Sequence, residues 1–481
     1  MTASTTPEQK VHRARVGLLG LFLLLGMSIS SWLARLPSVR EALGLSSSEL
    51  GLVLLAGAVG SLIAVTLAGG LVQRFGGRAV LTVGALGILV SFVLEGLGPA
   101  IGSVPVLAVG IFLNGASVAI TNVPQNVETA AVERRMGRAV LSQFHAAFSI
   151  GAVLGSLVGA ACAAADVSLL VQFTVTGVVA TVWRLLSIPH VILDTHLSDE
   201  VRWDRAVDAR TARVRRAEIR AGVVVPEPGT TGARAAMSAR TARLGAALGA
   251  WREPRTLYVG VVVLAAALSE GSANNWLNLA VVNDFGRTES VGALVFGGFV
   301  TAMTLVRLLG TRLIDSLGRV AVLRLSGAVS IVGLLLFGFA PSFPLACAGV
   351  LMWGAGAALA VPLGIAAASD DPLRAAARVS VVSAFASMAS LAAPPLLGFA
   401  AEHVGERLAL TSIVVAMVAS VLLSRHVARE TPEPAAASHP SEHAQAVDEA
   451  EAVRDVEIAV ATTTVPTVPT DLTDPTDPEK P

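Results

Sequence analysis

The sequence predicts an all-α polytopic membrane protein with twelve transmembrane helices, arranged as two six-helix bundles. Three observations support this fold class: apolar segments of similar length, arginines concentrated in alternate connections, and a likeness between the two halves of the chain. Hydrophobic residues make up 53% of the 481 residues and charged residues only 15%, whereas soluble domains carry about 25% charged residues. The zero formal net charge gives no reason to expect a nucleic-acid partner.

Twelve apolar segments each approach the roughly 20 residues that a helix needs to cross about 30 Å of hydrocarbon. No water satisfies backbone groups there, so a bundle of α-helices is the architecture we expect. The first segment is too long for a removed signal peptide and lacks a cleavage site, so we expect it to remain as the first helix. The expected segments are 16–34, 50–72, 80–98, 104–126, 140–164, 167–188, 256–282, 290–311, 320–340, 344–368, 379–401 and 407–424.

The basic residues of the short connections predict the orientation. Fifteen of them lie on one side of the expected helices and four on the other, and the positive-inside rule places the richer side in the cytoplasm. We therefore expect an integral protein of the bacterial inner or plasma membrane with both termini cytoplasmic. The four basic residues of the opposite side are Arg35, Arg40, Arg287 and Arg407.

Composition divides the chain into two helical halves and three polar segments. The central segment is rich in arginine and is either a helix lying on the anionic membrane surface or a solvated linker. The C-terminal segment is acidic and rich in Pro and Thr, and we expect disorder because it cannot bury enough apolar surface. The predicted parts are a cytoplasmic segment 1–13, a bundle 14–193, a cytoplasmic loop 194–255, a bundle 256–429 and a cytoplasmic tail 430–481.

Similar residues recur in the two halves at an offset close to 240 positions. Trp32 near the end of the first expected helix is matched by Trp276 in the seventh, and Pro124 in the fourth by Pro362 in the tenth. Two pseudo-symmetric six-helix repeats are typical of transporters that bind a solute between the halves, near the middle of the membrane.

Two connections carry a related motif, Gly-Gly-Leu-Val-Gln-Arg-Phe-Gly-Gly-Arg over 69–78 and Thr-Arg-Leu-Ile-Asp-Ser-Leu-Gly-Arg over 311–319. The motif resembles the cytoplasmic loop of the major facilitator superfamily, in which Gln73 takes the place of an aspartate that Asp315 keeps. An acid at this position caps a helix or pairs with arginines. Gln73 brings no charge, so we expect this loop to hold one conformation less firmly in the first half. The resemblance implies conformational roles for Gly69, Gln73, Arg74, Gly76, Arg78, Asp315, Gly318 and Arg319.

Further segments resemble the YbjJ-like and fucose-permease-related branch of this superfamily. They include the runs 31–37, 122–126, 142–145, 270–276 and 303–307. The resemblance implies the twelve-helix fold and solute transport. That branch often has an acid where this chain has Asn122 and Asn275, so proton coupling through these two positions is not expected.

Polar side chains within the expected helices mark the candidate solute site, because polar groups that face lipid are unstable. Amides suit a polar, hydroxyl-bearing solute, whereas a carboxyl group or an imidazole can carry a proton. The alternative is that these side chains only join helices through hydrogen bonds. The candidates are Asn114, Asn122, Gln125, Asn126, His145, Glu270, Asn274, Asn275, Asn278 and Arg307.

Some charged residues within the expected helices have more than one possible location for their side chains. Glu95 and Arg184 lie near helix ends, so we expect both at the membrane interface. Arg307 either joins the solute cavity or extends to the cytoplasmic surface, and the sequence leaves both alternatives open.

Glycines and prolines predict packing and bending. Gly151, Gly155 and Gly159 form a ridge of small residues that permits close approach of another helix. We expect interruptions at Pro124, Pro362 and the pair Pro394-Pro395.

Together these features predict a secondary transporter for a small polar organic solute, such as a sugar or related metabolite, that works by alternating access and is coupled to protons. The alternatives are an efflux pump for amphipathic compounds and a membrane sensor that does not transport. No catalytic or metal-binding motif is present in the sequence, so we expect neither an enzyme nor a cofactor. The expected partners are a solute, membrane lipid and protons, with no nucleic acid, and we expect a monomer.

Overall fold

The structure is a computed structural model that describes residues 7–137, 140–192, 249–371 and 374–429. All regular secondary structure in these ranges is helical, and twelve helical segments are long and apolar enough to span a membrane. The predicted number of spans is therefore confirmed. Most of the predicted central loop and the whole predicted tail lie outside the described residues, and the bounds given for the two bundles stay predictions.

The first half contains six spans in five long helices, because one helix makes two of them. The bend in that helix lies at Gly76, whose φ of 81° is accessible to glycine but strained for other residues. One short helix, α2, was not expected from the sequence. The elements are α1 (Pro7–Leu33), α2 (Leu36–Leu43), α3 (Ser47–Ala100), α4 (Val104–Met136), α5 (Leu141–Ala164) and α6 (Leu169–Val191).

The second half contains the other six spans, two of which are broken. The tenth span is divided between α12 and α13, and the twelfth between α15 and α16, which a short 3-10 turn follows. The elements are α9 (Pro254–Phe285), α10 (Glu289–Leu317), α11 (Arg319–Phe339), α12 (Phe343–Ala357), α13 (Ala360–Ala368), α14 (Ala375–Val404), α15 (Glu406–Thr411), α16 (Ile413–Leu423) and the turn Ser424–Val427.

The prolines interrupt fewer helices than the sequence predicted. α4 continues through Pro124, and α14 continues through Pro394-Pro395, so the expected interruptions there are wrong. The tenth span does break, and Pro362 lies in the first turn of α13 just after the break. Packing against neighbouring helices compensates the backbone bond that a proline removes within a membrane span.

The ridge of glycines on α5 packs against α1. A Cβ added at Gly151 would meet the carbonyl oxygen of Leu23, and one at Gly155 would meet that of Met27. Gly159 faces Ala34 in the same way. The predicted close approach is therefore confirmed, and its partner is the first helix.

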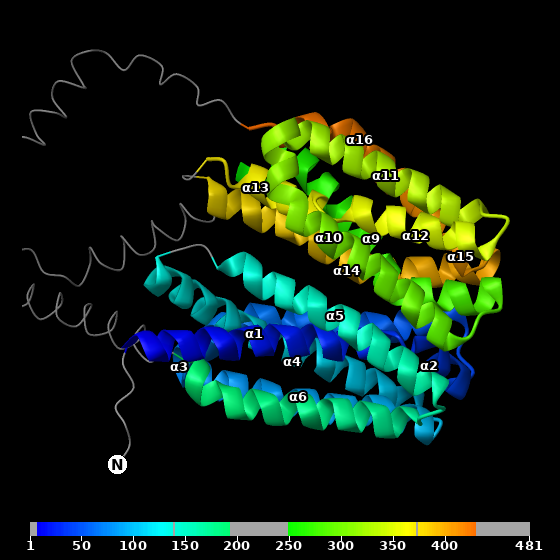
Figure 1. The fold of residues 1–481 in the computed structure, drawn as a ribbon, viewed down its shortest axis with the longest axis horizontal. Helices are drawn as coiled ribbons and strands as arrows, with labels where there is room; N and C mark the ends of the chain where they lie inside the picture. The colour runs from blue at the N-terminus through cyan, green and yellow to red at the C-terminus, as the bar shows by residue number, and fades with distance from the viewer. Residues whose placement is uncertain (1–6, 138–139, 193–248, 372–373, 430–481) are drawn as a thin grey trace, which may run out of the picture. The chain divides into compact units, whose positions relative to one another are not determined.

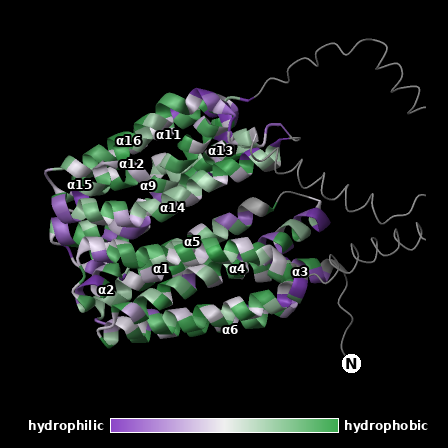
Figure 2. Ribbon diagram, turned by 180° about the vertical axis from the view of Figure 1, so that it is seen from behind, coloured by the Kyte–Doolittle hydropathy of each residue, from purple (hydrophilic) through white to green (hydrophobic). Residues whose placement is uncertain are grey.

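The two halves lie side by side, with α3 next to α14 and α5 next to α10. Figure 1 shows their ribbons converging at the end that carries α2 and α15, which we call the α2 end, and diverging towards the end where α1 begins. At the α2 end the backbones almost touch: a Cβ at Gly398 of α14 would lie 2.5 Å from the carbonyl oxygen of Ser47. Hydrophobic residues line the middle of the helices and hydrophilic ones gather at their ends (Figure 2), as a membrane span requires.

Candidate functional site

A cavity of about 230 Å³ lies between the two halves. Helices α1, α3 and α4 line it from the first half, and α9 and α14 line it from the second. Trp32 and Leu33, at the end of α1, place it close to the α2 end. Its polar lining side chains are Glu95, Asn114, Asn275 and Ser390.

Glu95 is the carboxyl group of this cavity. Its side chain is 1% exposed, and Oε1 accepts a hydrogen bond of 2.8 Å from Nδ2 of Asn114. Oε2 is also buried and has no hydrogen-bond partner among the described residues. The neighbouring helix comes this close because Gly110 of α4 has no side chain: a Cβ there would lie 2.9 Å from the backbone nitrogen of Glu95.

Glu95 is buried inside the protein, which its position near a helix end did not predict. The position of a residue along its own helix does not show which neighbouring helix covers it. Here α4 packs over Glu95. Arg184 of α6 is also buried, at 2% exposure. The sequence feature that relates to the burial of Glu95 is Gly110 of α4, which has no side chain and leaves room for that of Glu95.

The structure places two of the predicted amides, Asn114 and Asn275, in the cavity. Asn274, on the adjacent face of α9, is half-buried. Asn278 is buried, and its side-chain Nδ2 donates a hydrogen bond to the backbone oxygen of Ala34 in the other half. Asn278 therefore joins the halves, and its contact lies outside the cavity.

Glu270 and Arg307 form an ion pair within the second half. Nη2 of Arg307 lies 2.9 Å from Oε2 of Glu270, and both side chains are about a third exposed or less. Nε of Arg307 donates a 3.0 Å hydrogen bond to the backbone oxygen of Ala358, where the tenth span breaks. Arg307 therefore binds inside the bundle, and the alternative that it extends to the membrane surface is wrong.

The remaining predicted polar residues lie away from the cavity. Asn126 donates a side-chain hydrogen bond to Asn122 one turn earlier on α4, whereas Gln125 is buried. His145 of α5 is exposed, and its ring stands edge-on to Phe22 at 5.9 Å between centroids.

A buried ion pair joins the halves at the α2 end. Nε of Arg35 lies 2.9 Å from Oε2 of Glu289, with side chains 6% and 13% exposed. The Nε–H is not aligned for a hydrogen bond, so this contact is purely electrostatic. Ser38 donates its backbone N–H to Oε1 of Glu289 at 2.9 Å. In turn, Gln172 Oε1 accepts a 2.6 Å bond from Arg35 Nη1.

Glu406, at the start of α15, makes a second connection at this end. Its Oε1 accepts hydrogen bonds from Nη1 of Arg40 at 2.6 Å and from Oγ of Ser47 at 2.9 Å, both in the first half. Asn283 of the second half donates to the same oxygen at 3.0 Å. The sequence revealed neither connection, because ion pairs across 250 or more residues leave no local pattern.

The two motif connections share a backbone conformation at the opposite end. Gly318 has φ 80° and ψ 157°, and Gly76 has φ 81° and ψ 155°, which explains the glycine in both copies. Gly69, Arg74 and Arg78 are exposed, and the side chain of Gln73 is not among those described.

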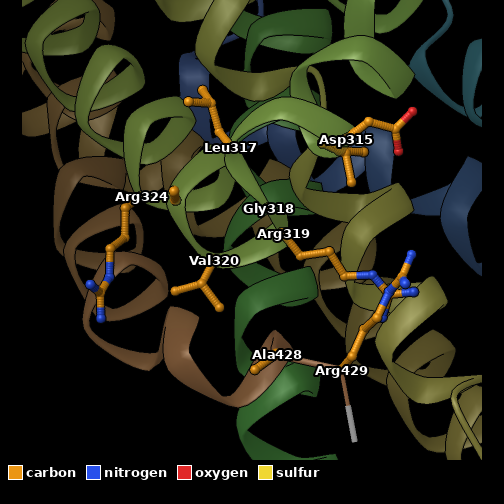
Figure 3. A pocket seen from close by; sticks show the side chains of 10 residues that line it. Asp315, Leu317, Gly318, Arg319, Val320, Arg324, Ala428 and Arg429 are labelled. Atoms are coloured by element: carbon orange, nitrogen blue, oxygen red, sulfur yellow. The ribbon is translucent and has the colours of Figure 1, made fainter. Parts of the chain in front are cut away.

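Asp315 makes no ion pair within the described residues. It is exposed on the wall of a surface cavity of about 860 Å³, and its carboxylate points away from Arg319 and Arg429 (Figure 3). Arg319 instead pairs with Asp370 at 2.7 Å, and Arg255 binds the same carboxylate at 3.1 Å. Among the described residues the expected pairing of Asp315 is therefore not made, and Arg319 pairs with Asp370 instead.

Glu253 secures the start of α9 to α14. Its Oε2 accepts hydrogen bonds from Nε of Arg378 at 2.8 Å and from Oγ1 of Thr256 at 2.7 Å. Burial raises the pKa of this carboxyl, but the hydrogen bonds from Arg378 and Thr256 and the charges of Arg378 and Arg374 lower it more, so the pKa lies below its ordinary value of 4.5.

The described residues contain no group of three or more His, Cys, Asp or Glu side chains that could hold a metal ion.

Comparison with known proteins identifies a family. The family model described as Major Facilitator Superfamily matches residues 16–251 and 259–468. The uncharacterized transporter y4wD of Sinorhizobium fredii is 31% identical over 407 residues, which cover 83% of this chain and 96% of the relative.

Solved structures share the fold at low sequence identity. A bacterial homolog of the human lysosomal transporter Spinster superposes with a TM-score of 0.66 at 13% identity and covers 89% of this chain and 100% of its own. The D-xylose–proton symporter superposes with a TM-score of 0.59 at 17% identity and covers 87% and 97%.

Proposed function

Because the chain belongs to the major facilitator superfamily, we propose that it is a secondary transporter that moves a small polar organic solute across the membrane by alternating access. The observation that carries the proposal is the cavity in which polar groups of both halves meet: Glu95 and Asn114 from the first half, Asn275 and Ser390 from the second. When one half rotates against the other, a solute bound by both halves becomes accessible from the opposite side of the membrane.

The lining of the cavity favours a small neutral solute rich in hydroxyl groups. Two amides and one hydroxyl offer hydrogen-bond donors and acceptors without fixed charge. Trp32 adds an aromatic wall. At about 230 Å³ the cavity is smaller than the roughly 300–1,000 Å³ of pockets for drug-sized molecules. A sugar or related metabolite fits these properties better than the large amphipathic substrate of an efflux pump.

The ion pairs at the α2 end support a state that is closed on that side. The positive-inside rule assigns the opposite end, with its many arginines, to the cytoplasm. We therefore assign this state as facing the cytoplasm, in a protein of the bacterial inner membrane. Single cysteines at Gly102 and Asp166, in a background with Cys162 and Cys347 replaced by serine, should react with an impermeant maleimide from outside; reaction only after permeabilisation would reverse this orientation.

Counterflow of radiolabelled monosaccharides in proteoliposomes tests the function. A transporter exchanges internal and external solute, whereas a membrane sensor binds solute without exchange. Asn114→Ala should lower counterflow about tenfold or more, because it removes a donor and leaves a buried acid unpartnered. Asn122→Ala is the matched control, since Asn122 is an amide of the same helix that does not line the cavity. Loss of counterflow in the control with full activity in Asn114→Ala would place the site elsewhere.

A further inference from the structure

We propose that Glu95 is the proton carrier of the transport cycle. The inference rests on the proposed transport function and names the coupling group of the same cavity. It replaces Glu270 and His145, which are the carboxyl group and the imidazole among the candidates predicted from the sequence.

The hydrogen bonding of Glu95 fits the protonated form. Oε1 already accepts from Nδ2 of Asn114, as the carbonyl oxygen of a carboxylic acid does. An ionised group would leave Oε2 as a buried negative oxygen with no donor, because no described residue bonds to it. With a proton on Oε2, the same atom becomes a donor. Asn114 thus holds one oxygen and leaves the other for the proton.

Among the described residues, no fixed cation pairs with Glu95. It is the only titratable residue that lines the cavity within the part of the chain that the structure describes. Arg184 of α6 is not close to Glu95. Thr181, one turn before Arg184 on α6, donates a hydrogen bond to the backbone oxygen of Ala85, which lies ten residues before Glu95 on α3. Other charged groups on neighbouring helices already have partners: Arg35 binds Glu289, Arg378 of α14 binds Glu253, and Glu270 of α9 binds Arg307.

This difference separates Glu95 from the other carriers. Glu270 has a fixed counter-ion in Arg307, and its protonation would leave Arg307 without that partner. His145 is exposed and is not among the residues that line the cavity. A proton on Glu95, by contrast, alters the hydrogen bonding of the cavity itself.

The two halves supply the mechanism of coupling. Asn275 and Ser390 belong to the second half and move away from Glu95 when the cavity opens to the other side. Water then reaches the carboxyl group, which takes a proton from one side and returns it to water on the other. One proton crosses with each solute molecule, and no covalent bond of the protein changes.

Infrared spectroscopy tests the protonation without any solute. The purified wild-type protein at neutral pH should show the carbonyl band of a protonated carboxyl group, and Glu95→Gln should abolish that band. Glu270→Gln is the matched control and should keep it. If Glu95→Gln does not fold, Asn114→Leu is measured instead. Loss of the Asn114 side-chain donor to Oε1 of Glu95 should shift the frequency of the carbonyl band. A band that persists in folded Glu95→Gln, or that Asn114→Leu leaves unmoved, overturns the proposal.

Transport tests the coupling, with the monosaccharide that shows the greatest counterflow in the wild type. A gradient of one pH unit supports up to about tenfold accumulation. Glu95→Gln should lower this accumulation ratio to one, whereas downhill counterflow, although reduced because Glu95 lines the cavity, should remain detectable. The double variant Glu270→Gln, His145→Gln should keep proton-driven accumulation. If the double variant loses accumulation and Glu95→Gln keeps it, the assignment is overturned. Absence of counterflow in the wild type would contradict the proposed function, whereas wild-type counterflow without proton movement would contradict only this inference.

Discussion

Removal of the charge of Glu289 should open the α2 end. Loss of one partner from a buried ion pair costs about 3–5 kcal/mol when the other charge is stranded. Arg35 keeps Gln172 and the Val167 carbonyl as neutral acceptors, at 2.6 and 3.2 Å, so we expect about half of that cost, about 2 kcal/mol. Glu289→Gln should therefore raise the population of the state open at the α2 end about 30-fold.

A buried cysteine measures this shift. Ala293 of α10 is 0% exposed and packs against Ala34 and Ala160 of the other half, so Ala293→Cys reacts with an impermeant maleimide only when that end opens. Its labelling rate should rise about 30-fold in Glu289→Gln. Glu41→Gln, an exposed carboxylate of α2, removes the same charge without breaking a connection. Equal labelling rates in the two variants would refute the reasoning.

Three further predictions concern packing, charge and pH. Gly398→Ala should disfavour the closed α2 end by about 1–3 kcal/mol through overpacking and speed the same labelling, whereas Gly70→Ala, with open space around it, should not. Asp370→Asn should lower the thermal stability by about 1–2 kcal/mol because it removes the carboxylate that pairs with both Arg255 and Arg319, and equal loss in the exposed Asp315→Asn would contradict this. The depressed pKa of Glu253 stabilises the fold above pH 4.5 and less at lower pH, so Glu253→Gln should flatten the fall of Tm between pH 5 and 4; an unchanged fall would show that other groups cause it.

Local sequence was sufficient for the membrane spans and for their arrangement in two related halves. Twelve apolar segments predicted twelve helices, because hydrocarbon thickness acts on each segment separately. The glycines of the motif and of the α5 ridge were also informative, because each position disfavours a side chain. Gly76 and Gly318 have positive φ, and Gly155 packs closely against α1. Breaks such as the one before Pro362 depend on neighbouring helices and were predicted less well.

The site depended on tertiary packing. The sequence identified Asn114 and Asn275 as candidate polar groups, but no feature of either helix indicates that they meet Glu95 in one cavity. Glu270 has a local pattern as suggestive as that of Glu95, and only the structure shows that one has an arginine partner and the other an amide. Hydropathy and spacing describe one helix at a time, whereas the charge state and access of a buried group are set by the helices packed around it.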